Sequence, residues 1–154
     1  MFWLYKILVM KRTFRFVVSC VFILSSFPVF SGNEIKNSTN EFDWSPVMDA
    51  IIQVESGGNR MARNGKQVGV MQITPIAVAE CNKILRLRKS KRRYSLSDRY
   101  SVSKSKEMFV LIQSFHNPQN DVEQAIRAWN GGPNYSLVGT QRYYEKVIRH
   151  LMNG

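Results

Sequence analysis

The segment DWSPVMDAIIQVESGG, Asp43–Gly58, carries the clearest secondary-structure signal in the 154-residue chain. Ser45 and Pro46 are residue types favoured as the N-cap and the first residue of a helix, and Gly57 with Gly58 favours its end. Between them, residues spaced as on one face of a helix are Val47, Met48, Ile51, Ile52 and Glu55. The segment therefore predicts a helix of about ten residues whose apolar face includes a glutamate.

The chemistry of Glu55 follows from this position. It lies four residues after Ile51 and three after Ile52, so its carboxyl shares their apolar face. Desolvation there raises the pKa of a carboxyl, and the partial negative charge of the last helical turn raises it further. Both effects favour the protonated form that general-acid cleavage of a glycosidic bond requires. The alternative is a glutamate that turns into solvent at a frayed helix end.

The charge distribution separates the N-terminus from the remainder. The chain has 22 basic and 11 acidic residues, and residues 1–31 contain four of the basic ones and none of the acidic ones. An apolar run of about 15 residues, 16–30, follows these cations and is shorter than the ~20 residues of a spanning helix. We therefore expect a cleaved secretory signal at 1–31, with an uncleaved membrane anchor as the alternative. The polar segment 32–43 is expected to be a flexible linker and 44–154 one catalytic domain.

The remaining segments also predict helices. They are expected to begin near Pro75, near Ser103, at Asn120 or Asp121, and near Thr140. Asn64-Gly65 is a turn signal, and a short hairpin is expected around 65–70. We expect Ile76, Ala79, Ile84 and Leu87 to be buried in the second helix, and Met108, Phe109, Leu111, Ile112 and Phe115 in the third. The prediction is a mainly α domain with at most a short hairpin.

Cysteine, histidine and cation patterns limit the chemistry. Export would leave only Cys81, which is expected to be a small buried residue without a disulfide. His116 and His150 are isolated, so no metal site is expected. The run RLRKSKRR, Arg86–Arg93, is either a solvated helix end or an electrostatic contact for a polyanion.

Four short motifs, taken in order, resemble those of the soluble lytic transglycosylase (SLT) family over about residues 44–151. The family pattern is a Glu-Ser pair, a Gly-Leu-Met-Gln-x-x-Pro loop, an Ala-Tyr-Asn-Ala-Gly segment and a late Tyr. The matching stretches here are Glu55-Ser56, GVMQITP at 69–75, AWNGGP at 128–133, and Thr140 with Tyr143 and Val147. This chain departs from the family pattern at Val70, Trp129 and Gly131, where the usual residues are Leu, Tyr and Ala.

The resemblance implies a lysozyme-like fold and cleavage of the bond between N-acetylmuramic acid and N-acetylglucosamine. It implies that Glu55 is the sole catalytic acid and base, and that Ser56 orients it. By the same resemblance Gly69, Met71 and Gln72 line the cleft, Asn130 bonds a sugar, and Tyr143 lies beside Glu55. Met71 could instead fill the core, and Tyr144 is the alternative to Tyr143. Asp98 and Asp121 are expected to have structural roles, in a turn and at a helix cap.

The family mechanism needs no second carboxyl, because the sugar's own 6-hydroxyl closes an anhydro ring on muramic acid. We expect no cofactor, a monomer in the periplasm or cell envelope, peptidoglycan strands as substrate, and contact with a membrane only through the signal segment. A secretion or conjugation apparatus is a candidate partner, whereas nucleic acid is not expected for an exported protein. The alternatives are a hydrolytic muramidase of the same fold, a non-catalytic glycan-binding module, and a polyanion-binding protein acting through Arg86–Arg93.

Overall fold

The structure, a computed structural model, describes residues 42–153. The predicted signal segment at 1–31 and nearly all of the predicted linker at 32–43 lie outside these residues. In chain order the elements are α2 (Ser45–Ser56), β1 (Arg63–Asn64), β2 (Gln67–Val68), α3 (Pro75–Leu87), the 3-10 helix η1 (Leu96–Tyr100), α4 (Val102–His116), α5 (Val122–Gly131) and α6 (Leu137–Asn153). The prediction of a mainly helical domain with one short hairpin is confirmed.

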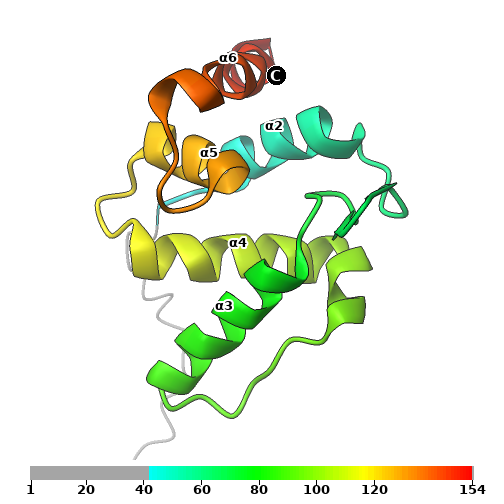
Figure 1. The fold of residues 1–154 in the computed structure, drawn as a ribbon, viewed down its shortest axis with the longest axis vertical. Helices are drawn as coiled ribbons and strands as arrows, with labels where there is room; N and C mark the ends of the chain where they lie inside the picture. The colour runs from blue at the N-terminus through cyan, green and yellow to red at the C-terminus, as the bar shows by residue number, and fades with distance from the viewer. Residues whose placement is uncertain (1–41, 154) are drawn as a thin grey trace, which may run out of the picture. The chain divides into compact units, whose positions relative to one another are not determined.

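The helices are arranged around α4. Figure 1 shows α2 and α5 on one side of α4, with α6 beyond them, and α3 on the other side. Helix α6 packs on both α2 and α5, and α3 packs on α4. The hairpin pairs Arg63 with Val68 and Asn64 with Gln67, and it lies beyond the end of α2. Among the described residues, no helix combines the length and apolar character that crossing a membrane requires.

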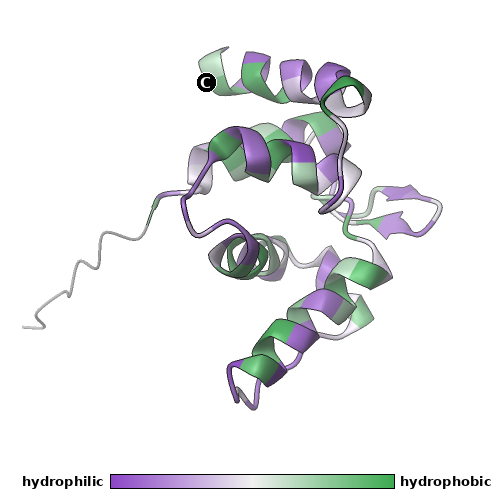
Figure 2. Ribbon diagram, turned by 60° about the vertical axis from the view of Figure 1, so that its left-hand side comes forward, coloured by the Kyte–Doolittle hydropathy of each residue, from purple (hydrophilic) through white to green (hydrophobic). Residues whose placement is uncertain are grey.

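Each helix buries one face, as the alternation of hydrophobic and hydrophilic residues along the ribbons in Figure 2 indicates. The fully buried side chains with the largest volumes include Phe109, Ile51, Met71, Ile73, Ile84 and Met108. An aromatic series crosses this core, since the ring of Phe109 lies 5.6 Å from that of Trp44 and 5.1 Å from that of Trp129. The core therefore joins α2, α4 and α5.

The start of α2 differs from the prediction by one residue. Trp44 is the N-cap and Ser45 is the first helical residue, and the side chain of Ser45 makes no capping hydrogen bond. Instead Oδ1 of Asp43 accepts a hydrogen bond of 2.9 Å from the backbone nitrogen of Ser45. The predicted end of the helix is confirmed, because Gly57 adopts a left-handed conformation with φ of 59°.

The predicted buried face of α3 was wrong in phase. Ile84 is fully buried, but Ile76 and Leu87 are 80% and 60% exposed, and Ala79 is exposed. The helix buries Val78, Cys81, Ile84 and Leu85 instead. The segment has apolar residues on two overlapping stripes, and packing against α4 selects one of them. Phe115, near the end of α4, is also exposed rather than buried.

Candidate active site

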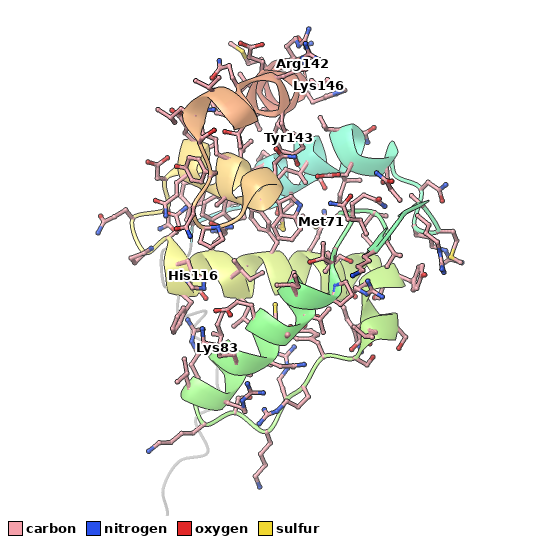
Figure 3. The ribbon with its side chains drawn as sticks, viewed as in Figure 1. Met71, Lys83, His116, Arg142, Tyr143 and Lys146 are labelled. Carbon is pink, nitrogen blue, oxygen red and sulfur yellow. The ribbon has the colours of Figure 1, made fainter. Side chains whose placement is uncertain are left out.

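Glu55 lies in the last turn of α2, where it faces α6. Its Oε1 accepts a hydrogen bond of 2.8 Å from the hydroxyl of Tyr143. Figure 3 shows Tyr143 on the side of α6 that faces α2. Both side chains are half-buried, so each is only partly hydrated. The structure thus brings together the glutamate and the tyrosine of the first and last sequence motifs, which are 88 residues apart.

The environment of this pair favours the neutral forms of both groups. Burial raises the pKa of Glu55 above its usual 4.5, and the hydrogen bond from Tyr143 opposes that shift in part. Burial, with the nearby Glu55 carboxyl, also raises the pKa of Tyr143, so its hydroxyl stays a donor at neutral pH. Neither pKa is shifted by a nearby cation. Glu55 is therefore a half-buried carboxyl with one fixed donor and no charged partner.

Ser56 acts on the neighbouring loop rather than directly on the carboxyl. Its hydroxyl lies 2.8 Å from the carbonyl oxygen of Val70 and 3.3 Å from that of Ile52. The contact with Val70 ties the end of α2 to the segment 69–75. Any orientation of Glu55 by Ser56 is therefore indirect, through the backbone, and a contact of Ser56 with sugar stays a prediction.

Gly69 is required by the fold of this loop. It is buried with φ of 79°, and a Cβ at this position would lie 1.9 Å from the backbone oxygen of Arg99. The close neighbour of Gly69 is thus a backbone carbonyl of η1. The expected approach of a glycan to Gly69 stays a prediction, but the packing alone already explains the glycine.

The other two predicted loop residues are also buried. Met71 is fully buried, so the structure places its side chain in the core, which was the alternative to a cleft position. Gln72 is 7% exposed, and its Nε2 donates a 2.9 Å hydrogen bond to the oxygen of Gly69. Gln72 has φ of 49°, a conformation that costs a non-glycine residue about 1–3 kcal/mol. Backbone strain of this kind is typical of binding sites, so it supports Gln72 as a candidate binding residue of the loop.

Trp129 connects this loop to α5. Its indole nitrogen donates a hydrogen bond of 3.2 Å to the carbonyl oxygen of Met71, and its ring packs on Phe109. The substitution of tryptophan for tyrosine therefore leaves a polar tie to the loop. Asn130, the next residue, is exposed, and its side chain makes no hydrogen bond within the part of the chain that the structure describes. Its amide is available to a ligand.

Gly131 is not simply interchangeable with the usual alanine. A Cβ added here would lie 2.7 Å from the Cβ of Tyr135 and 2.8 Å from Cγ2 of Thr140. Both distances are shorter than real Cβ contacts, so the turn between α5 and α6 would have to move. As folded here, Tyr135 and Thr140 lie too close to Gly131 to leave room for the Cβ of an alanine at this position.

Two buried arginines support the site and were not predicted. Arg99 donates to the carbonyl oxygens of Lys66 and Ile73, and it thereby holds the hairpin and the loop against η1. Arg127 is 4% exposed and donates to Glu123 on α5 and to Leu137, Thr140 and Gln141 on α6. Its guanidinium lies 4.3 Å from the ring centroid of Tyr144. Tyr144 is therefore engaged by Arg127, while Tyr143 contacts Glu55.

The other carboxyl side chains of the described residues have partners elsewhere. Asp98 accepts from Lys104 and from the backbone of Ser95, which lowers its pKa, and Asp121 caps α5. The predicted cap role of Asp121 is confirmed, whereas Asp98 has a structural role in η1, where it forms a capping box with Ser95, rather than in a turn. The remaining partnerships are Asp43 with Ser45, Asp49 with Lys106, Glu80 with Lys83 and His116, Glu107 with Arg92, Glu123 with Arg127, and Glu145 with Gln141. Among the carboxyls of residues 42–153, Glu55 is the one that accepts a hydrogen bond from a tyrosine hydroxyl and has no basic group as a partner.

A surface hollow of about 510 Å³ lies between α2 and α6. It is lined by Pro46, Asp49, Ala50, Gln53, His150, Leu151 and Asn153. Glu55 does not line it, although Gln53 is two residues away on the same helix. Within residues 42–153, no group of three or more histidine, cysteine, aspartate or glutamate side chains is placed to hold a metal ion.

Comparison with known proteins gives one family. The family model for the transglycosylase SLT domain matches residues 33–151. No curated protein and no solved structure matches the chain. The matched residues include α2 to α5 in full, α6 as far as Leu151, and all four motifs, from Glu55-Ser56 to Tyr143. The chain therefore belongs to the transglycosylase SLT domain family, a lysozyme-like family of glycan-cleaving enzymes that act on peptidoglycan.

Proposed function

We propose that this protein is a peptidoglycan lytic transglycosylase in which Glu55 acts first as acid and then as base. Protonated Glu55 gives its proton to the oxygen that bridges N-acetylmuramic acid and N-acetylglucosamine, and the bond from that oxygen to C1 of muramic acid breaks. The substrate's N-acetyl carbonyl stabilises the cationic C1. The ionised Glu55 then takes the proton of the 6-hydroxyl, whose oxygen bonds to C1 and closes the 1,6-anhydro ring.

The observation that carries the proposal is the hydrogen bond between Glu55 and Tyr143 in a half-buried position. Burial favours the protonated acid, whereas the hydroxyl of Tyr143 can stabilise the carboxylate formed when the proton leaves. Tyr143 keeps its own proton in both steps because its pKa is raised. The pair can therefore give up a proton and recover one without a second titrating group.

The environment of the other carboxyls favours a transglycosylase over a muramidase. A hydrolase that activates water with a second carboxylate needs that group within several ångströms of the acid. Each other acid in residues 42–153 has hydrogen-bond or ion-pair partners other than Glu55 and Tyr143, and no other acid contributes to the raised pKa of Glu55. Closure by the sugar's own hydroxyl avoids the need for such a group.

Asn130 and Gln72 are proposed to bond the glycan. Export to the periplasm or cell envelope is proposed from the apolar segment 16–30.

Product analysis tests the proposal. The chain and its Glu55→Gln variant are incubated with purified peptidoglycan, and the released muropeptides are identified by mass. We expect 1,6-anhydro ends from the wild type and roughly 10²–10⁴-fold slower release from the variant. Glu145→Gln, which removes one carboxylate from the surface of α6, is the matched control and should retain activity. Reducing ends would indicate a muramidase, and release that does not depend on Glu55 would refute the catalytic role.

A further inference from the structure

Helix α6 carries a row of cations beside the candidate active site. We call Arg142, Lys146 and Arg149 the basic stripe. All three are exposed, and none forms an ion pair or a side-chain hydrogen bond within residues 42–153. The acid of the same helix, Glu145, accepts from Gln141 instead. The three charges are therefore available to a ligand.

Helix geometry places the basic stripe on the side of α6 next to Tyr143. Successive helical residues are about 100° apart, so Lys146 lies about 60° from Tyr143 around the axis and Arg142 about 100°. Arg149 lies about 120° from Tyr143 in the same sense. The buried residues Thr140 and Val147 lie on the opposite side of Tyr143. Tyr143 thus marks the edge of the buried face, and the basic stripe begins where that face ends.

The contacts of Tyr143 and Tyr144 show which neighbouring helix lies next to each of them. Tyr143 reaches Glu55 on α2, whereas Tyr144 lies against Arg127 of α5. Lys146, the cation nearest to Tyr143 around the helix, therefore lies beside the seam between α2 and α6, and Arg142 and Arg149 continue the stripe onto the outer side of α6, where Arg149 lines a second hollow with Tyr144, Glu145 and Ile148. Figure 3 shows Arg142 and Lys146 at the outer edge of α6 and Tyr143 between α6 and α2. The same seam contains the hollow of about 510 Å³ that includes Gln53 and His150. Its one acid, Asp49, is paired with Lys106.

The basic stripe does not serve Glu55 itself. A cation in contact with the carboxyl would lower the pKa of Glu55, but the pKa is raised, and burial and Tyr143 are the causes. The stripe spans about 10 Å along the helix from Arg142 to Arg149. It therefore offers several charges to an extended anionic ligand that lies next to the acid without touching it.

We propose that the basic stripe binds the carboxylates of the peptide stems on peptidoglycan, so that the protein prefers peptide-bearing glycan with free carboxylates. The inference rests on the proposed function, because a glycan strand placed over Glu55 carries its peptides outward along the adjoining surface. Separate positive side chains suit carboxylates that are spaced along a flexible peptide. The stripe then sets substrate preference, and Glu55 with Tyr143 sets the chemistry.

Another group of cations provides a matched comparison. In the run Arg86–Arg93, Arg88, Arg92 and Arg93 bond to Ser114, Glu107 and Ser90 respectively. Arg86, Lys89 and Lys91 are exposed and make no such bond within the described residues. They lie at the far end of α3 and in the loop after it, which Figure 1 shows on the opposite side of α4 from α6. Removing these three charges changes net charge as much as removing the basic stripe.

Binding to insoluble sacculi tests the inference. The full chain carrying Glu55→Gln is cosedimented with untreated sacculi and with sacculi whose carboxylates have been converted to amides. We expect roughly tenfold weaker binding to the amidated sacculi, in line with a few exposed ion pairs. Adding Arg142→Gln, Lys146→Gln and Arg149→Gln should remove that preference, whereas Arg86→Gln, Lys89→Gln and Lys91→Gln should keep it. Lys146→Gln alone should reduce it in part, which keeps the test open if the triple variant is unstable.

Two results would overturn the inference. One is an unchanged preference in the basic-stripe variant, and the other is an equal loss in the variant of the Arg86–Arg93 run, which would indicate a general charge effect. The outcome is independent of cleavage because the assay uses the Glu55→Gln chain. Failure of the proposed function would instead be seen as absence of released muropeptides from the wild-type chain.

Discussion

Glu55 is a residue whose ionisation opposes folding. Its pKa in the folded chain is raised above 4.5, so the folded state holds this proton more tightly than the unfolded state does. Stability is therefore greatest at low pH with respect to this group, and it is lost as the pH rises from the unfolded value through the raised folded value. A conflict of this kind is expected where a side chain is retained for chemistry rather than for stability.

Replacing Glu55 by glutamine should reveal that conflict. Glutamine cannot ionise, and its amide oxygen can still accept the hydrogen bond from Tyr143. We expect Glu55→Gln to raise Tm at neutral pH by roughly a few degrees, and this gain to shrink as the pH falls through the raised folded pKa of Glu55 and to be absent below 4.5. Thermal unfolding of both proteins over a pH series measures the difference. A gain that grows on acidification would have the wrong sign for a raised pKa.

Tyr143 and Tyr144 allow a matched test of the hydrogen bond. Tyr143→Phe removes the donor that lowers the pKa of Glu55, so the alkaline limit of activity should move to higher pH. We also expect kcat to fall roughly tenfold, because a hydrogen bond that stabilises the carboxylate is lost. Tyr144→Phe keeps the ring under Arg127 and should change neither property. Equal effects of the two substitutions on the pH profile of muropeptide release would contradict the assignment of Tyr143.

At the scale of elements, the loop 69–75 depends on contacts from several parts of the chain. Ser56 of α2 bonds to Val70, Trp129 of α5 bonds to Met71, and Arg99 of η1 bonds to Ile73. The strained backbone of Gln72 lies among these contacts. The loop is thus held to elements on both sides of it, as a preorganised binding segment requires.

Substitutions at Gly69 and Gly57 test how firmly the loop 69–75 is held against η1. Both have left-handed φ values, but a Cβ on Gly57 meets no atom within 4 Å, whereas a Cβ on Gly69 meets the oxygen of Arg99. Gly57→Ala should cost about 1 kcal/mol through backbone strain alone, and Gly69→Ala more than about 3 kcal/mol. Urea unfolding of the two variants measures this difference. Similar midpoints would show that the loop can move away from η1.

The sequence predicted the elements better than their contacts. Pro46, Gly57 and the apolar spacing between them located α2 within a residue, since local rules decide helix ends. The buried face of α3 was not decidable locally, because Ile76 and Val78 are equally apolar and only α4 distinguishes them. Arg99 and Arg127 were missed for the same reason, as each satisfies carbonyl groups that come close only in the folded chain. Pairing of Glu55 with Tyr143 came from motif order, not from periodicity.

At the scale of the whole molecule, stability in residues 42–153 comes from packing and buried polar contacts. The described cysteine, Cys81, is free and fully buried, and burial raises its pKa to about 12. No buried polar side-chain atom of the described residues lacks a hydrogen-bond partner. The domain is therefore a closed core around α4, and Glu55 lies at its margin.

The reactivity of Cys81 should report on this core. A buried thiol with a raised pKa has little thiolate, so we expect no labelling by a thiol reagent until the domain unfolds. In a Cys20→Ser background, the labelling rate in increasing urea should follow the unfolded fraction measured by circular dichroism. Rapid labelling in the absence of urea would instead show that α3 separates readily from α4.

The most direct test of the account is the titration of Glu55 itself. The carboxyl carbon of Glu55 is followed by NMR against pH, and its assignment comes from the loss of the signal in Glu55→Gln. We predict a midpoint above 4.5, because burial outweighs the hydrogen bond from Tyr143. A midpoint at or below 4.5 would show that the carboxyl is ionised at neutral pH as readily as a free side chain, and it would contradict the role of Glu55 as the acid.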